Sequence, residues 1–138
     1  MTASPTGAAP GPWIRFELFA EDPARSVAFW TGVLGFEVQH GDHASTSVRS
    51  GQVVVGIGRV DLLPPTAPGP GFDQERVRAG RGAGVEIVLE VEDLDAFHAQ
   101  VVAAGWPVAE PLQRRPWGLR DFRVADPDGY YVRVTHRP

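Results

Sequence analysis

The sequence predicts an α+β domain in which two βαβββ repeats form a curved eight-stranded mixed sheet with helices on its convex face. Two observations point to the repeat. The strand-to-helix pattern Ile14–Asp22 returns at Val85–Asp93, 71 residues later. The glycines that end the two helices, Gly35 and Gly105, are 70 residues apart. A third observation is that Pro116–His136 reads as strand, tight turn and strand, which would complete the second repeat.

The first repeat begins with an alternating strand over Trp13–Ala20. Asp22 is then placed to cap a helix, and Pro23 occupies the first helical position, where its missing N–H costs nothing. The helical spacing of apolar residues ends at Gly35, a residue that favours helix termination. Three short strands are expected to follow: Phe36–His40, Ala44–Arg49 and Gln52–Gly58.

The second repeat follows the same order. An alternating strand over Val85–Val91 leads to Asp93, the expected cap of a helix that runs to Gly105. The sequence Asp126-Pro127-Asp128-Gly129 predicts a turn, because proline presets φ at one corner and glycine tolerates a positive φ. Three later strands are predicted: Trp106–Val108, Leu119–Ala125 and Tyr130–His136.

The repeats divide the chain into four segments. Residues 1–12 are rich in small residues, Pro and Gly, which predicts a flexible tail. The first module spans 13–60, and the second spans 83–138. Between them, residues 61–82 carry four prolines and a polar, glycine-rich run, and we interpret them as a linker or mobile flap without regular secondary structure.

Composition narrows the possible functions of this 138-residue chain. A net charge of −4 without a basic cluster argues against nucleic-acid binding and against an anionic membrane surface. There is no cysteine, and all 13 basic residues are arginine, so neither thiolate nor Schiff-base chemistry is available. No apolar run is long enough to span a bilayer, which led us to expect a cytoplasmic protein.

The concave face of the predicted sheet is the expected ligand site, because a cleft where two repeats meet is a common binding place. Strand alternation assigns charged and aromatic side chains to this face. They are Arg15, Glu17, Glu86, Glu90, Tyr131 and Arg133.

Several motifs give the chain a resemblance to the vicinal oxygen chelate superfamily, which includes glyoxalases, extradiol dioxygenases and bleomycin-resistance proteins. The likeness extends from about Trp13 to Thr135. It implies the fold described above and leaves the chemistry open, since this scaffold hosts many activities. The motifs that carry it are Glu21–Trp30, Leu34-Gly35-Phe36, Glu92–Ala96 and Asp126–Gly129.

The resemblance also implies where a divalent metal would be held. Family ligands stand seven residues before each helix-capping Asp and four residues after the turn glycine, which here are Arg15, Glu86 and Arg133. A guanidinium has no lone pair to donate and stays protonated, so two of these positions cannot bind a metal. We therefore expect no metal and no cofactor.

Without a metal, the resemblance implies a bleomycin-resistance-like protein that binds a small molecule in the concave cleft of a homodimer. The Trp117-Gly118 step fits that branch, and Trp117 and Tyr131 could stack on an aromatic ligand. Alternatives stay open. Glu86 could bridge the two arginines so that the cluster satisfies only itself, or the cleft could be filled by its own side chains. The protein could also be a metal-free isomerase, cyclase or hydrolase with a cleft glutamate as general base, or a metal-dependent lyase or dioxygenase.

Overall fold

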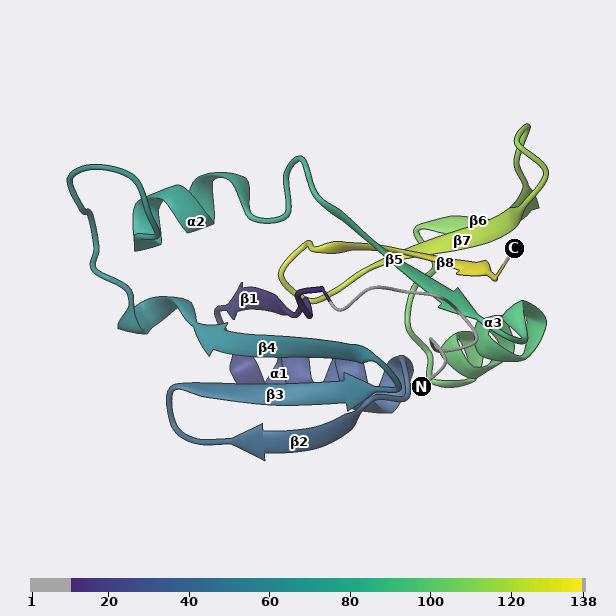
Figure 1. Cartoon of the computed structure of the whole chain (residues 1–138), viewed down its shortest axis with the longest axis horizontal. Coiled ribbons are helices and arrows are strands. Elements are labelled where there is room, and N and C mark those ends of the chain that lie inside the picture. The colour runs from purple at the N-terminus through teal and green to yellow at the C-terminus, as the bar shows by residue number, and fades with distance from the viewer. Residues whose placement is uncertain (1–10, 138) are drawn as a thin grey trace, which may run out of the picture.

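The computed structural model describes residues 11–137; residues 1–10, most of the predicted tail, and residue 138 lie outside it. Its eight strands form two separate four-stranded sheets, so the single continuous sheet of the prediction is divided (Figure 1). The N-terminal sheet has the order β1 (Phe16–Ala20), β4 (Val53–Arg59), β3 (Ser45–Ser50), β2 (Glu37–Gly41). The C-terminal sheet has the order β5 (Glu86–Val91), β8 (Tyr131–His136), β7 (Arg120–Ala125), β6 (Glu110–Arg114).

Both sheets have the same internal arrangement. The first strand of each module pairs in parallel with the last, β1 with β4 and β5 with β8, and the remaining pairs are antiparallel. A parallel pair needs a crossover connection, which the helix of each module begins. The α+β class and the two βαβββ modules are therefore confirmed.

The two module helices begin in the same way. Asp22 caps α1 (Pro23–Ala28) with φ −124° and ψ 93°, and Asp93 caps α3 (Leu94–Ala103) with φ −124° and ψ 92°. Each carboxylate accepts a hydrogen bond from the backbone N–H three residues on, at 3.3 Å and 3.0 Å. The caps predicted from the sequence are confirmed. The first helix then widens into a π-helical turn, η1 (Phe29–Val33), before Gly35 turns the chain at φ +80°.

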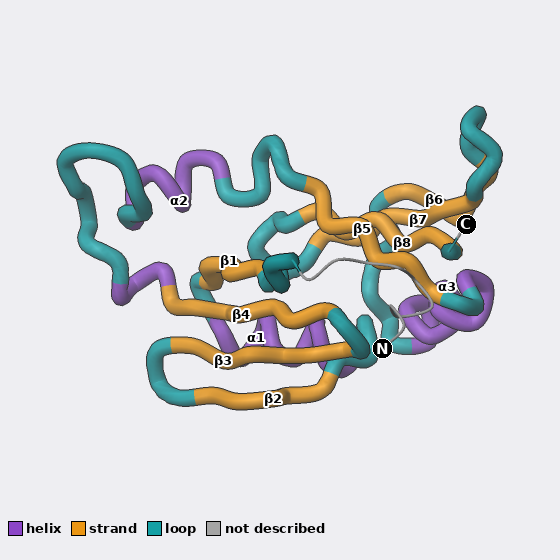
Figure 2. The backbone as a smooth tube through the Cα atoms, viewed as in Figure 1, coloured by secondary structure: helices purple, strands orange, loops and turns teal. Residues whose placement is uncertain are grey.

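The segment between the modules contains regular structure that the sequence analysis did not predict. A short 3-10 turn, η2 (Val60–Leu62), follows β4, and a helix, α2 (Gln74–Gly80), stands apart from both sheets (Figure 2). Asp73 caps α2 and is buried, accepting backbone hydrogen bonds from Arg76 and Ala67 at 2.7 Å and 3.0 Å. The expectation that 61–82 lacks any element was wrong.

One predicted strand is absent from the described residues. Trp106–Val108 is irregular, and pairing with β7 begins only at Glu110. Trp106 has a different role, because its indole N–H donates to the carbonyl of Ala125 at 2.9 Å. Its ring also packs 4.8 Å from that of Phe29, which ties the second module to the first helix.

One hydrophobic core joins the modules. Trp30, fully buried, packs edge-on against Phe29 and Phe36, with ring centroids 5.8 Å and 5.2 Å apart. Gln100 of α3 donates to the carbonyl of Val33 at 3.0 Å across the module boundary. The core therefore occupies the helix-covered faces of the sheets and leaves the opposite faces open. Among the described residues no helix is both long and apolar enough to cross a membrane.

Candidate functional site

The open face of the C-terminal sheet carries a closed circuit of alternating charges, which we call the ion-pair ring. In order around the circuit its members are Glu86, Arg133, Asp121, Arg115, Glu110 and Arg123. The two oxygens of Glu86 lie 3.1 Å from Nε of Arg133 and 2.6 Å from Nε of Arg123. Asp121, whose side chain is 0% exposed, lies 2.8 Å from Nε of Arg115 and 3.5 Å from Nη1 of Arg133.

Glu110 closes the ring. Its Oε1 lies 2.6 Å from Nη2 of Arg115 and 3.0 Å from Nη1 of Arg123, and its Oε2 accepts the Tyr131 hydroxyl at 3.2 Å. The hydrogen bond from Arg115 is the largest of the effects that hold the pKa of Glu110 below its ordinary value. Burial, reinforced by the negative charge of Glu110, raises the pKa of Tyr131. Three cations balance three anions, so the ring has no net charge and no unpartnered member.

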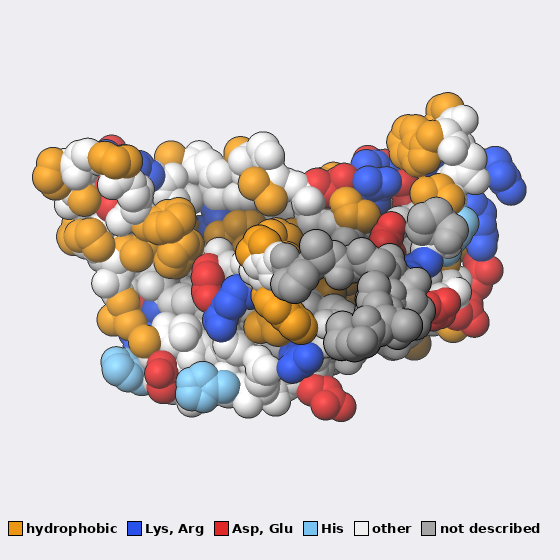
Figure 3. All heavy atoms as spheres, in the orientation of Figure 1, with side chains coloured by type: hydrophobic (Ala, Val, Ile, Leu, Met, Phe, Trp, Pro, Cys, Tyr) orange, Lys and Arg blue, Asp and Glu red, His pale blue; other side chains and the backbone are white. Residues whose placement is uncertain are grey.

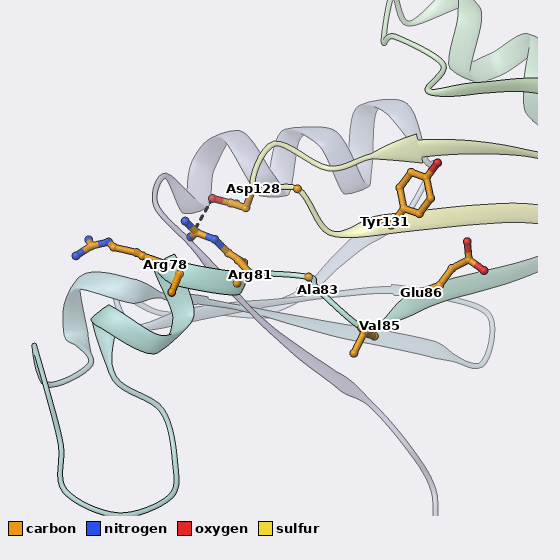
Figure 4. A pocket seen from close by; sticks show the side chains of 12 residues that line it. Arg78, Arg81, Ala83, Val85, Glu86, Asp128 and Tyr131 are labelled. Atoms are coloured by element: carbon orange, nitrogen blue, oxygen red, sulfur yellow. Dashed lines mark ion pairs between the residues drawn. The ribbon is translucent and has the colours of Figure 1, made fainter.

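A pocket of about 690 Å³ opens beside the ring, and we call it the polar pocket (Figure 4). Glu86 and Tyr131 lie at one end of it, and Arg78, Arg81 and Asp128 lie at the other. The backbone of residues 79–85 forms the wall between these ends. The volume lies in the range of small-molecule sites, and its lining offers peptide groups as well as charged side chains.

Arg81 fixes this wall to both modules. Its guanidinium lies 2.9 Å from Glu21 before α1 and 3.3 Å from Asp128 in the β7–β8 turn, and it donates to the carbonyl of Phe19 at 3.3 Å. Arg78 also pairs with Glu21, at 2.9 Å. The hydrogen bond from Arg78 is the first cause that lowers the pKa of Glu21 to about 2. Segment 61–82 is therefore anchored at its C-terminal end.

A close approach at Gly82 completes the wall. Its φ of +78° lies in the region that favours glycine, and a Cβ there would meet the carbonyl oxygen of Gly129 at 2.8 Å. The wall thus presses directly on the predicted Asp126–Gly129 turn, whose Gly129 takes φ +95°.

The structure brings together only part of the predicted concave cluster. Glu86 and Arg133 are paired as expected, but Arg15 lies on the N-terminal sheet with other partners. Its Nη2 is 2.7 Å from Oε1 of Glu17 and 3.3 Å from Oγ of Ser47. Within residues 11–137, no ion pair joins Arg15 to Glu86, so Glu86 does not bridge the two arginines.

The remaining predicted residues lie apart from one another. Glu17 is placed against Gly56, where any side chain would collide with its carboxylate. Glu90 is exposed on β5, and no ion pair involves it in the part of the chain that the structure describes. Trp117 is 59% exposed beyond β6, with the Arg115 guanidinium 6.0 Å from its ring.

These positions do not fit the metal site that the resemblance implies. Of Arg15, Glu86 and Arg133, only Glu86 has a metal-ligating side chain, and both of its oxygens already accept guanidinium hydrogen bonds. No group of three His, Cys, Asp or Glu side chains is arranged to hold a metal within residues 11–137. We derive no metal-dependent step for this site.

Four members of the ion-pair ring were missed in the sequence analysis: Glu110, Arg115, Asp121 and Arg123. Asp121 and Arg123 stand two residues apart on β7, on the same face as Arg133 of β8, which pairs in register with Arg123. Alternation along the predicted strand Leu119–Ala125 was therefore a usable signal. The position of Arg115, after an irregular β6, had no such signal.

Comparison with known proteins agrees with the fold. A sequence profile of the Glyoxalase/Bleomycin resistance protein/Dioxygenase superfamily matches residues 14–134. No curated protein matches the sequence closely enough to count as a relative.

Solved structures give the same assignment of fold. TioX from Micromonospora sp. ML1 is 26% identical, with a TM-score of 0.71 over 93% of this chain and 100% of that one. A lactoylglutathione lyase from Agrobacterium tumefaciens is 20% identical, with a TM-score of 0.69 over 93% and 96%. A bleomycin-binding protein in complex with bleomycin is 18% identical, with a TM-score of 0.67 over 93% and 100%. The profile match covers most of the chain, and on that ground the protein belongs to the glyoxalase/bleomycin resistance protein/dioxygenase superfamily.

Proposed function

We propose that this protein binds a polar organic small molecule of no net charge in the polar pocket, without a metal, as a homodimer. The observation that carries the proposal is the state of Glu86. Of the residues at the three family positions, Glu86 alone has a side chain that can bind a metal. Its two carboxylate oxygens accept hydrogen bonds from Nε of Arg123 at 2.6 Å and from Nε of Arg133 at 3.1 Å.

Metal independence is tested first. We expect protein purified without chelators to contain far less than one equivalent of metal by elemental analysis. Ni²⁺, Mn²⁺, Zn²⁺ and Fe²⁺ should leave the thermal unfolding temperature unchanged, because binding to the native state alone would raise it. One equivalent of metal that is lost in Glu86→Gln would contradict this part of the proposal.

The charge of the ligand follows from the balance of the pocket. Arg78 and Arg81 at one end are already paired with Glu21 and Asp128, and Glu86 at the other end is paired within the ring. A charged ligand would have to break one of these pairs, whereas an uncharged polar ligand can bond to the backbone of residues 79–85 and the Tyr131 hydroxyl.

A thermal-shift panel of uncharged polar organic compounds, with the cationic metal-free bleomycin as a charged comparison, would supply a ligand. For the compound that binds, we expect Tyr131→Phe to weaken binding about tenfold, a loss typical of one hydrogen bond, because the hydroxyl that would bond to the ligand is removed. Glu86→Gln should weaken binding by a similar factor, because it breaks the pairs with Arg123 and Arg133 that hold this end of the pocket in place. Glu90→Gln is the matched control, because Glu90 lies on the same strand but does not line the polar pocket. Equal affinity in all three variants would place the ligand elsewhere.

The homodimer is supported by the exposed edge strand of each sheet. β1 and β5 are both edge strands, paired on one side only among the described residues. Exposed apolar side chains outside the polar pocket stand on or beside them, namely Trp13, Ile14 and Val88. Open strand edges with apolar neighbours favour pairing with another chain. We expect twice the mass of one chain in light scattering, and the mass of one chain in a Val88→Arg variant; one-chain mass in the parent protein would contradict the dimer.

The alternative of a metal-free enzyme depends on Glu90, an exposed carboxylate outside the polar pocket and without an ion pair among the described residues. Glu86 is less suited to act as a base, since each of its oxygens already accepts a guanidinium hydrogen bond and taking up a proton would weaken these ion pairs. Turnover of a bound compound that is lost in Glu90→Gln and retained in Glu86→Gln would favour the enzyme over the binding protein.

A further inference from the structure

A second cavity lies on the other side of the wall formed by residues 79–85, against Gly80–Ala83 and Val85. Its volume is about 420 Å³, and it is enclosed between β1, α2 and the start of β5. We call it the apolar pocket, because most of its side-chain lining is aromatic or aliphatic. These side chains are Phe16, Leu18, Phe19, Phe72, Val77, Ala83, Val85, Ile87 and Tyr130.

We propose that the apolar pocket is a separate binding site for an uncharged, largely aromatic small molecule. The first argument is exposure. Phe72 is 64% exposed, yet its ring lies only 4.8 Å from that of Phe19, so the two rings form an aromatic wall that the chain itself does not cover. Hydrophobic side chains gather at this α2 end of the molecule (Figure 3). Covering such surface with an apolar ligand is favourable in proportion to its area.

The second argument is that the pocket offers no unpaired charge. Glu17 pairs with Arg15 at 2.7 Å, Arg76 pairs with Asp73 at 3.6 Å, and Arg81 pairs with Glu21 at 2.9 Å. The Tyr130 hydroxyl is also occupied, since it accepts from the backbone N–H of Phe19 and donates to the carbonyl of the same residue. A charged ligand would find no free partner here, and would lose its hydration without compensation.

The third argument is that polar contacts hold the pocket open. Arg78 and Arg81 fix the end of α2 to Glu21, and Gln74 donates to the carbonyl of Leu63 at 2.8 Å at the start of the helix. Anchored at both ends, α2 cannot collapse onto the apolar wall of β1. A preformed cavity requires little ordering when a ligand enters, which favours binding.

The probe for this site is N-phenyl-1-naphthylamine, an uncharged aromatic compound whose fluorescence rises when it leaves water. We expect saturable binding with one site per chain. Val77→Trp fills the pocket from α2 and should weaken binding more than tenfold. Phe72→Ala removes half of the aromatic wall at an exposed position, where folding is not at risk, and should weaken binding about fivefold.

Two controls separate this site from the polar pocket and from general stickiness. Val102→Trp adds the same side chain at an exposed position on α3 and should bind the probe like the parent protein. Glu86→Gln should also leave probe binding unchanged, so failure of the polar-pocket proposal would not affect this result. Unaltered binding in both Val77→Trp and Phe72→Ala would overturn the proposal. Probe binding that falls as the protein concentration, and with it self-association, rises would also overturn the proposal, because a second copy of the chain would then fill the pocket.

Discussion

The two modules repeat one backbone plan but present different open faces. At equivalent positions, Arg15 of the first module corresponds to Glu86 of the second, and Glu17 to Val88. On the N-terminal sheet the pair Arg15–Glu17 is half exposed and isolated. On the C-terminal sheet six charges, the buried Asp121 among them, close into the ion-pair ring. The aspartates that cap the helices are the same in both modules, whereas the charged residues on the open faces differ.

The largest expected effect tests this contrast directly. Asp121→Asn leaves Arg115 and Arg133 without their buried carboxylate, and should lower the free energy of unfolding by about 3 kcal/mol. Glu17→Gln breaks the corresponding isolated pair on the other sheet, and should lower it by less than about 1 kcal/mol. Urea denaturation of both variants provides the measurement. Equal losses would mean that the ring stabilises the fold no more than a surface pair does.

The next-largest effect concerns the helix caps, which the two modules share. Because Asp22 and Asp93 cap their helices with the same backbone geometry, Asp22→Ala and Asp93→Ala should each lower the free energy of unfolding by about 1 kcal/mol. The two losses should add in the double variant, since the caps do not touch each other. A difference of more than twofold between the single variants would show that the repeat is not energetically symmetric.

The smallest effect distinguishes Glu21 from Glu92, its equivalent in the second module. Glu21 is held by Arg78 and Arg81, whereas Glu92 is 85% exposed and, within the part of the chain that the structure describes, pairs only with Arg137 at 3.3 Å. Arg78 is the first cause that lowers the pKa of Glu21 from 4.5 to about 2. A lowered pKa in the folded state gives stability that is present above pH 4.5 and is lost as pH falls towards 2.

Glu21→Gln should therefore unfold on the order of 2 °C below the parent protein at pH 6, a small shift because the carboxylate is partly exposed. The difference should disappear by pH 2. Glu92→Gln is the matched control and should follow the parent protein at both pH values. A shift in Glu21→Gln that persists at pH 2 would assign it to lost packing instead of lost charge.

Local signals in the sequence were sufficient to predict the two βαβββ modules. Asp22, Asp93 and the glycines after each helix act through bonds within one turn, so their effect is readable without knowing the rest of the fold. The helix α2 was not predicted, because the prolines and glycines around it dominate the composition of residues 61–82. Its cap, Asp73, is stabilised partly by Ala67, a contact that only the folded loop creates.

The site was harder to predict because it depends on where the two sheets lie. Glu86 and Arg133 meet because neighbouring strands β5 and β8 carry them, a relation that the repeat already implies. Arg15 belongs to a different sheet, and no local pattern specifies the distance between two sheets. Arg115 enters the ring through a loop after an irregular strand pairing, which lacks the period-two pattern of a regular strand.

The attachment of Arg81 to both modules has a consequence for the covalent chain itself. Each half carries its own strands and helix, and the shared core, with the contact of Arg81 to Glu21, holds the halves together independently of the connection between them. Residues 68–70 are exposed and lie outside these contacts. The protein is therefore suited to division there into two complementary fragments, whose reassembly would report directly on how strongly one half recognises the other.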